Sequence, residues 1–559
     1  MWPGDSKPVV APSAKILPIK NVEQHAAYWT SEPGWDTELQ LRNNLPAEPL
    51  TVTPVLRLPS RQEIPLTAVT IPPNGSVSVS VNEDLQEHAP DLLGRPDSYG
   101  SVTFRFQSHH AMNLYATAVP SLRGQPVAFH IPTHPEWNAA DASRGNGPGS
   151  LEGIWWQERS GLKDLLLINN TSDAEISGTL SLFDASGKGW SEPLSLGPHQ
   201  LERMAMNDLL QKADLKGSYG GISFEVPASA SALDGVHLVY DEGGKFSASL
   251  EMFHRDPNAT VRDRTGSDQE PWTMRAPMLA LSAPDLALGL SSEKTLQPTL
   301  MVRNTTAHSV SANGTLNWRS DSGKGQVKLP ELQLAPFATK QLPIWAMQKQ
   351  LGIPADAHWA SVSLTTNAAP DDLIAIASSR DCTGAYNAET KFIGGRGGRF
   401  SGGEWRLDAT HNRIAAITNV GSQTTDALLT LHYDSGGKNY ELQQSIAPGE
   451  QMCVNLGQLV QQRVVDRRGN FLPVDVSAVT YDLEDLAPGG RSLMASDLSV
   501  DTVSGHAISN CPICCNYYSS VFFNPDPILV LFGGADVLGV DGILACNNQT
   551  FSITSNFTT

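Results

Sequence analysis

The chain is poor in charged residues, and especially in basic ones. Only 17% of its 559 residues are charged, and 39 Lys and Arg stand against 58 Asp and Glu, so the net charge is −19. Soluble domains usually carry about 25% charged residues. Because affinity for nucleic acid comes mainly from clustered Lys and Arg, this composition argues against a nucleic-acid partner.

Long hydrophobic segments are also missing. The longest apolar stretch, residues 528–535, is much shorter than the ~18 residues that a membrane-spanning helix needs. Residues 1–24 contain no apolar stretch of the length found in a secretory signal. The sequence therefore predicts no membrane span, and no export signal is visible in it.

Common catalytic motifs are absent as well. The sequence has no GxSxG nucleophile elbow, no HExxH zinc motif and no GxGxxG after a predicted strand. The SGK and GGK strings at residues 186–188, 322–324 and 436–438 lack the GxxxxGK[ST] frame of a phosphate loop. We therefore expect neither enzyme activity nor a cofactor.

Gly and Pro, in contrast, are more frequent than average, with 47 and 38 residues. Many chain-turning residues together with low charge favour a loop-rich β protein. At about 100–200 residues per domain, the length predicts three to five domains.

An internal repeat divides the chain into four units. A hydrophobic strand ends in Asn at Asn43, Asn169, Asn304 and Asn419, with spacings of 126, 135 and 115 residues. Each Asn is followed, 29 to 32 residues later, by a turn that contains Pro. An apolar residue in a short helix-like patch comes next, namely Leu85, Leu209, Met347 and Leu459. Because these features recur in the same order in all four units, they indicate four related domains.

Apolar residues alternate with polar ones within each unit, for example at Val77, Val79 and Val81, which is typical of half-buried strands. Gly-containing hairpin turns follow at residues 184–187, 321–324 and 434–437. Several short strands in about 100 residues predict an immunoglobulin-like sandwich. The predicted fold class is all-β, with four tandem antiparallel Ig-like β-sandwiches, short helical turns and a small Cys-containing C-terminal β segment.

The predicted division follows the repeat. It comprises an N-terminal extension (1–25), four sandwiches (26–131, 152–256, 279–394 and 402–500), linkers (132–151, 257–278 and the Gly-rich 395–401) and a Cys-bearing partial β module (501–559). Because the linkers are polar or Gly-rich, we expect flexible or semi-extended joints between the sandwiches.

The repeats resemble tandem Ig-like or fibronectin-III-like modules of exported bacterial surface proteins. The segment from Pro525 to Cys546 is similar to the start of a bacterial Ig-like module of the kind found in intimin-type adhesins. This resemblance implies a surface, adhesive or spacer role and supplies no shared catalytic residues.

A cysteine cluster marks the C-terminal segment. Cys511, Cys514 and Cys515 lie close together, with Cys546 downstream and His506 upstream. A bond between the adjacent Cys514 and Cys515 would be strained, so a disulfide from the cluster to Cys546 is the favoured hypothesis. The CxxC spacing also fits a metal site or a redox pair, and both alternatives stay open.

Three other groups have both a functional and a plain interpretation. Trp155 and Trp156 are candidate sugar-stacking contacts, although packing in the core or between modules is favoured. His130 and His134 have the HxxxH spacing of a helical metal site, but Pro132 and Pro135 prevent that helix. The acidic group Asp482, Glu484 and Asp485 is interpreted as a solvated surface rather than a calcium site.

Taken together, these features predict a non-enzymatic, exported or cell-surface protein that serves as a stalk, spacer or adhesion array. Its expected partner is a protein or glycan at an extracellular surface. The alternative is a carbohydrate-binding accessory region of a larger secreted enzyme, with Trp155 or Trp156 in contact with the sugar.

Overall fold

The computed structural model describes residues 19–109, 111–135, 148–156, 161–227, 230–241, 243, 246–258, 271–281, 296–320, 322–381, 387–394, 398–487, 490–501, 507–510, 543–546 and 549–552. Antiparallel strands dominate this part of the chain, and its helices are short. The predicted all-β class of tandem sandwiches is confirmed. None of the described helices is long and apolar enough to cross a membrane.

Each of the four modules is a sandwich of two sheets, here named sheet I and sheet II. Sheet I of module 1 has the order β10 (His134–Pro135), β1 (Lys20–Thr30), β7 (Tyr99–Ser108), β3 (Leu50–Arg57) and β4 (Glu63–Pro65), with β5 (Val69–Ile71) also paired to β3. Its sheet II has the order β6 (Ser76–Ser80), β2 (Trp35–Asn43), β8 (Leu114–Leu122) and β9 (Ile131–Pro132).

Module 2 repeats this plan. Its sheet I contains β14 (Gly189–Leu196), β13 (Ile176–Asp184), β16 (Tyr219–Val226), β11 (Gly149–Trp156) and β19 (Phe253–Arg255). Its sheet II contains β15 (Leu201–Ala205), β12 (Leu162–Asn170), β17 (Leu233–Asp241) and β18 (Ser247–Glu251).

Modules 3 and 4 follow the same order. In module 3, sheet I is β20 (Trp272–Ala280), β26 (Ala357–Thr366), β22 (Val310–Ser320) and β23 (Lys324–Lys328), with β24 (Leu332–Leu334) on β22, and sheet II is β25 (Thr339–Pro343), β21 (Thr299–Asn304), β27 (Leu373–Arg380) and β28 (Asn387–Lys391). In module 4, sheet I is β29 (Arg399–Arg406), β34 (Ala478–Asp485), β31 (Thr425–Tyr433) and β32 (Lys438–Ile446), and sheet II is β33 (Gln451–Asn455), β30 (His411–Asn419), β35 (Leu493–Asp501) and β36 (Ala507–Asn510).

Alternating side chains build these sandwiches. In β22, every second residue from Val310 to Leu316 is buried, while the alternate residues Ser311, Asn313 and Thr315 are more exposed. The predicted helix-like patches are the short helices α1 (Val81–His88), α3 (Met206–Lys212), α5 (Ile344–Met347) and α6 (Leu456–Gln461). Each helix directly follows an edge strand of sheet II, namely β6, β15, β25 or β33. The strand order differs from that of an immunoglobulin domain, in which the last two strands, F and G, share a sheet. Here the strand after the helix (β7, β16, β26 or β34) belongs to sheet I, and the following strand (β8, β17, β27 or β35) belongs to sheet II.

A buried Asn ends the second strand of every module, and it explains the strongest mark of the repeat. The side-chain nitrogen of Asn304 donates to the carbonyl oxygens of His308 and Ala335, at 2.6 and 2.9 Å, and its oxygen accepts from the backbone N–H of Thr306 at 2.9 Å. Asn43, Asn170 and Asn419 make the same bonds.

The equivalent residue in module 2 is therefore Asn170, and the sequence-based choice of Asn169 is wrong by one position. Two consecutive Asn residues left the pattern ambiguous, and only the hydrogen bonds distinguish them.

The Pro-containing turns are also equivalent. The residue after Pro has a left-handed φ in all four, at Asn74 (53°), His199 (53°), Phe337 (58°) and Gly449 (73°). In each turn the next N–H donates to the carbonyl three residues earlier, at 3.0–3.1 Å. Pro followed by a positive φ is the signature of a type II turn.

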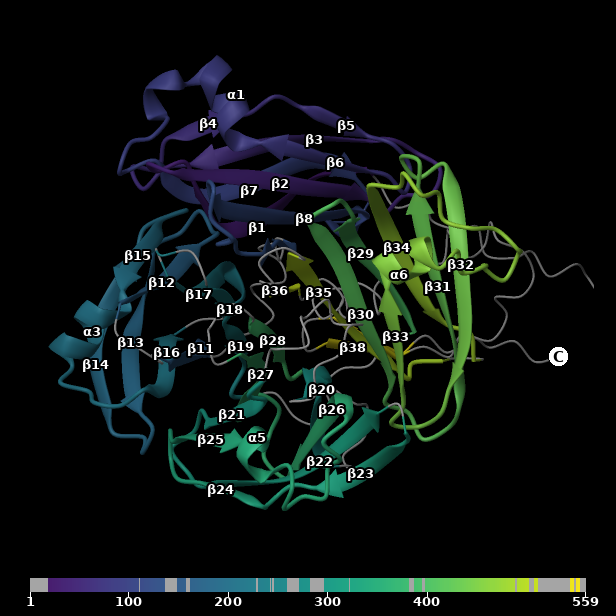
Figure 1. Ribbon diagram of the computed structural model, residues 1–559. Coiled ribbons are helices and arrows are strands. Elements are labelled where there is room, and N and C mark those ends of the chain that lie inside the picture. Colours follow the sequence, from purple (N-terminus) through teal and green to yellow (C-terminus); the bar gives the residue numbers. More distant parts are fainter. Residues whose placement is uncertain are drawn as a thin grey trace, which may run out of the picture.

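The four modules are arranged as a closed ring (Figure 1). Module 1, drawn in purple, and module 4, drawn in green, are in contact although they are at opposite ends of the repeat. At each joint, sheet II of one module packs on sheet I of the module before it, and β2 and β8 of module 1 pack on β29 of module 4. The described modules therefore pack directly on one another, in contrast to the flexible or semi-extended joints that the linker composition predicts.

Strands also begin inside segments that the sequence assigned to linkers. β11 starts at Gly149, β20 at Trp272 and β29 at Arg399, and β36 adds residues 507–510 to module 4. Each of these strands completes a sheet, so chain with the composition of a linker contributes to the sandwiches.

Candidate functional site

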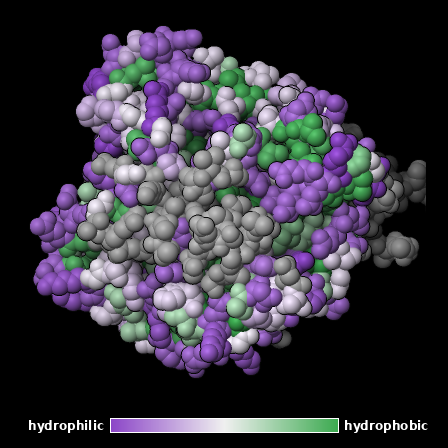
Figure 2. Space-filling view, viewed as in Figure 1, coloured by the Kyte–Doolittle hydropathy of each residue, from purple (hydrophilic) through white to green (hydrophobic). Residues whose placement is uncertain are grey.

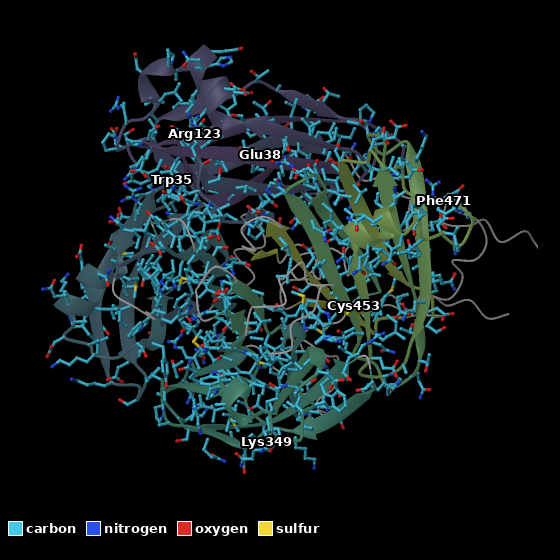
Figure 3. All side chains as sticks on the ribbon, in the orientation of Figure 1. Trp35, Glu38, Arg123, Lys349, Cys453 and Phe471 are labelled. Atoms are coloured by element: carbon cyan, nitrogen blue, oxygen red, sulfur yellow. The ribbon has the colours of Figure 1, made fainter. Side chains whose placement is uncertain are left out.

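Three of the four joints are apolar. Leu167, Val236 and Leu238 of module 2 belong to the core cluster of module 1. A second cluster joins Trp156 and its neighbours to Met301, Ile374 and Ile376 of module 3, and a third joins modules 3 and 4. Trp35, on the side of module 1 nearest module 2 (Figure 3), contacts Phe129 and Tyr240 at ring-centroid distances of 5.9 and 5.4 Å.

The fourth joint, between modules 4 and 1, is polar and closes the ring. Arg42 of β2 is 1% exposed, and its Nη1 donates to the carbonyl oxygens of Gly402 and Tyr481 at 2.6 and 2.5 Å. Its Nη2 lies 3.0 Å from Oδ1 of Asp482. The other oxygen of this carboxylate, Oδ2, lies 2.8 Å from Nε2 of His432. A buried guanidinium with a carboxylate and two carbonyl partners is held firmly, since removing one partner would leave a charge unpaired.

Further polar contacts surround Arg42 at this closing joint. Glu38, labelled in Figure 3, accepts from Arg406 at 2.8 Å, and Ser76 donates to Glu404 at 2.6 Å. The Thr480 hydroxyl donates to the carbonyl of Asn74 at 2.8 Å. No buried apolar cluster of the described residues spans this joint.

The joint between modules 2 and 3 contains an equivalent arginine. Arg303 donates to the carbonyls of Gly153 and Ile222, at 3.1 and 2.7 Å, and to Glu152 at 2.6 Å. Gly153 and Ile222 are register partners, as are Gly402 and Tyr481. Arg42 and Arg303 both directly precede the buried Asn, so a charge within an apolar strand was the available sequence signal for this contact.

The contacts of the closing joint keep the Asp482 carboxyl ionised. Burial alone would raise the pKa of this carboxyl, but the Arg42 guanidinium and the His432 ring hold it well below its ordinary value. The acidic cluster at 482–485 was interpreted as a solvated surface. For Asp482 this is wrong, because both of its oxygens are engaged inside the ring-closing contact.

A cavity of about 40 Å³ lies where the inner edge strands meet, and His130, Asp234, Glu251, Glu389 and Lys391 are among its lining residues. It has room for about three water molecules. The ion pairs Lys391–Glu251 (3.3 Å) and Arg380–Glu389 (2.7 Å) neutralise charge there. The Ser249 hydroxyl donates to the His130 carbonyl at 3.3 Å.

His130, which belongs to the first predicted sandwich, is buried at this centre. Burial lowers the pKa of its imidazole to about 3, and the nearby Arg413 and Arg406 guanidiniums add to this effect. The ring is therefore neutral at physiological pH. Among the described residues, no group of three or more His, Cys, Asp or Glu side chains is placed to hold a metal ion.

The two tryptophans proposed as ligand contacts lie in the interior. Trp155 is 0% exposed and donates from Nε1 to the Phe183 carbonyl at 2.9 Å. Trp156 is 1% exposed and lies in the joint with module 3, beneath the Arg380 guanidinium at 3.6 Å. Neither ring presents a face to solvent, so the sugar-stacking interpretation is wrong and the packing interpretation is right.

The cysteine predictions lie beyond what the structure describes. Cys511, Cys514 and Cys515 are outside the described residues, as is His506. The backbone of Cys546 ends strand β37 (Ile543–Cys546), which pairs with β38 (Gln549–Ser552). The disulfide, the metal site and the redox pair therefore stay predictions.

Comparisons with known proteins give little further information. No family model matches the chain, and no curated protein matches it. One solved structure that it is similar to is described as the tetra-tandem repeat in the extending region of a large adhesion protein. The identity is 10%, with 84% of this chain and 92% of that chain covered, and the TM-score is 0.10. A TM-score this low does not establish a common arrangement of modules.

Proposed function

We propose that the chain is a non-enzymatic interaction scaffold of an exported or cell-surface protein, whose four modules act as one compact ring. The observation that carries this proposal is the closing joint, in which Arg42 of module 1 is buried against Gly402, Tyr481 and Asp482 of module 4. A chain that returns on itself in this way is shorter than a stalk of the same modules laid end to end.

The resemblance to modules of exported bacterial surface proteins supports a role in binding at a surface. In a scaffold of sandwiches, partners are bound by loops that a rigid framework positions. The visible face of the ring is mostly hydrophilic around its rim, with smaller hydrophobic patches (Figure 2). The expected partner is a protein or glycan. No observation favours the carbohydrate-binding alternative, since its two proposed contacts are buried.

Small-angle X-ray scattering of the purified chain tests the compact ring. A single compact body of 559 residues has a radius of gyration of about 24 Å. Four sandwiches placed end to end, each about as long as a nine-residue strand at ~3.3 Å per residue, would give roughly 35 Å. A value near the larger figure in neutral buffer would reject the ring and restore the spacer interpretation.

A further inference from the structure

One loop of module 4 differs from its three equivalents. The connection from the short helix to the next strand of sheet I spans residues 89–98 in module 1, 213–218 in module 2 and 348–356 in module 3, but 462–477 in module 4. It is therefore the longest of the four and is here called the module 4 loop. An extension in one copy of a repeat is not explained by the sandwich that all four copies share.

This loop concentrates exposed apolar side chains. Among the described residues, six large hydrophobic side chains are exposed, and three of them lie here: Val465 (54%), Phe471 (39%) and Val474 (74%). Phe471 is at the outer edge of module 4, away from the ring centre (Figure 3). Exposed apolar groups that gather in one place usually mark an interaction site.

The loop is held in one shape by its own hydrogen bonds. Oδ1 of Asp466 accepts from the N–H groups of Arg468 and Asn470 at 2.8 and 2.7 Å, and Asp466 N–H donates to the Asn470 carbonyl at 2.9 Å. The Tyr440 hydroxyl donates to the Val464 carbonyl at 3.0 Å, and Leu472 is buried in the core of module 4. A rigid loop loses little entropy when it binds.

The charges of the loop indicate the chemistry of its partner. The Arg463 guanidinium lies 4.6 Å from the centroid of the Phe471 ring, and Arg463 is exposed. Arg467 and Arg468 are exposed too and pair with Glu441, so the exposed charges of the loop are mainly basic, with Asp475 as its exposed carboxylate. Asp466 is buried and accepts bonds from within the loop. A partner that covers the Phe471 ring also meets Arg463, and a carboxylate is the acceptor that forms the strongest hydrogen bonds with a guanidinium.

We propose that the module 4 loop is the docking surface for a protein segment that carries apolar side chains next to an Asp or Glu. This inference rests on the proposed function, because it names the partner class of the scaffold. Phe and Arg are among the residue types that are enriched in protein interfaces. A bilayer is disfavoured as the partner, because three exposed apolar side chains on a chain of net charge −19 bind a membrane only weakly.

The probe is a phage-displayed library of random dodecapeptides, selected on the full chain and counter-selected on a Phe471→Ser/Val474→Ser variant. We expect enriched peptides to combine apolar residues with a carboxylate. Their affinity falls by at least ~10-fold in the double variant, as for residues at the centre of an interface. The Arg463→Gln variant binds these peptides more weakly than the wild type, whereas Trp345→Ser, which removes an exposed apolar group (47%) elsewhere, binds them equally.

Three results would overturn the inference. They are the absence of peptides that depend on the loop, peptides without carboxylates that ignore Arg463→Gln, and loop-dependent binding to vesicles of phosphatidylcholine with one quarter phosphatidylglycerol. The radius of gyration of each variant is measured in parallel. A compact ring that selects no peptide rejects the docking surface alone, whereas an extended chain rejects the scaffold.

Discussion

The side chains that matter most at the residue scale are the four fully buried Asn residues, because each one joins two segments of its module: the loop that follows its strand and the chain at the Pro-containing turn. Asn43, Asn170, Asn304 and Asn419 are all 0% exposed, and each satisfies backbone groups that water cannot reach. An unsatisfied buried polar group costs about 1–3 kcal/mol. The repeat in the sequence is thus a repeat of hydrogen-bonded loop supports.

Replacing Asn170 tests this role against its neighbour. We expect Asn170→Ala to lower the free energy of unfolding by on the order of 2–3 kcal/mol, because carbonyls of Ala174, Leu196 and Gly197 lose their donor. Asn169→Ala is the matched control and should be the milder change. Denaturant unfolding of both variants measures the difference. A larger loss for Asn169 would contradict the assignment.

His130 gives the ring centre a dependence on pH. Its pKa is about 3 in the folded chain, mainly through burial, and about 6.5 when unfolded. The unfolded state therefore binds more protons between these values, so stability falls as the pH decreases from about 6.5 toward 3. The full effect is roughly 3–5 kcal/mol.

A His130→Asn variant measures this contribution directly. We expect its unfolding free energy to change less than that of the wild type between pH 6.5 and 4, since Asn does not titrate. Thermal or denaturant unfolding across this pH range provides the comparison. Parallel profiles for the two proteins would show that the pKa of His130 does not differ between the folded and the unfolded chain, which would contradict this prediction.

At the scale of elements, the joints explain why the hairpin tips and the Pro turns repeat together. The tip of one module contacts the Pro turn of the next, as when the Thr339 N–H donates to the Ala185 carbonyl at 3.1 Å and Phe183 stacks on Phe337 at 4.8 Å. Arg61 approaches Gln200 in the first joint, and Lys324 pairs with Glu450 in the third. Such head-to-tail contacts close into a ring when the rotation between units permits.

The tip of module 4 makes the last of these contacts, with the Pro turn of module 1. A Cβ on Gly436 would lie 2.3 Å from the Pro73 carbonyl oxygen. We expect Gly436→Ala to open the closing joint and raise the radius of gyration in solution scattering. Gly124→Ala is the control, because its φ of 72° resembles the 84° of Gly436 but its Cβ meets nothing within 4 Å. If both variants raise the radius of gyration equally, the strain of an Ala at a positive φ, and not the contact with Pro73, explains the effect.

Sequence reasoning predicted the sandwiches because strand alternation and turn chemistry are local. It could not predict the joints, because Arg42 and Asp482 are 440 positions apart and neither belongs to a recognisable motif. Alternation also cannot separate a buried Trp from an exposed one, so Trp155 and Trp156 stayed open until the packing was known. The Gly-rich linkers suggested freedom between modules, whereas three apolar joints remove it.

On the scale of the whole molecule, the closing joint differs from the other three in the kind of contact that forms it. The other three joints bury apolar clusters and connect modules that are adjacent in the chain. Within the described residues, the joint between modules 4 and 1 is mainly polar, although the Tyr115 ring packs over Gly403. Charge-assisted contacts depend on protonation, so acid should act here in addition to its effect on His130.

Acid is therefore expected to open the ring at Asp482. The folded pKa of this carboxyl is depressed, because the partners Arg42 and His432 outweigh its burial. A depressed carboxyl pKa contributes stability above the unfolded value of about 3.9, and this stability is lost progressively as the pH falls below it. The radius of gyration should thus rise below about pH 4, while β-sheet circular dichroism still reports folded modules. Asp482→Asn, which cannot ionise, should already be more open at neutral pH and change less in acid. If the radius of gyration of the wild type stays constant until the sheets unfold, the charge of Asp482 does not hold the closing joint together.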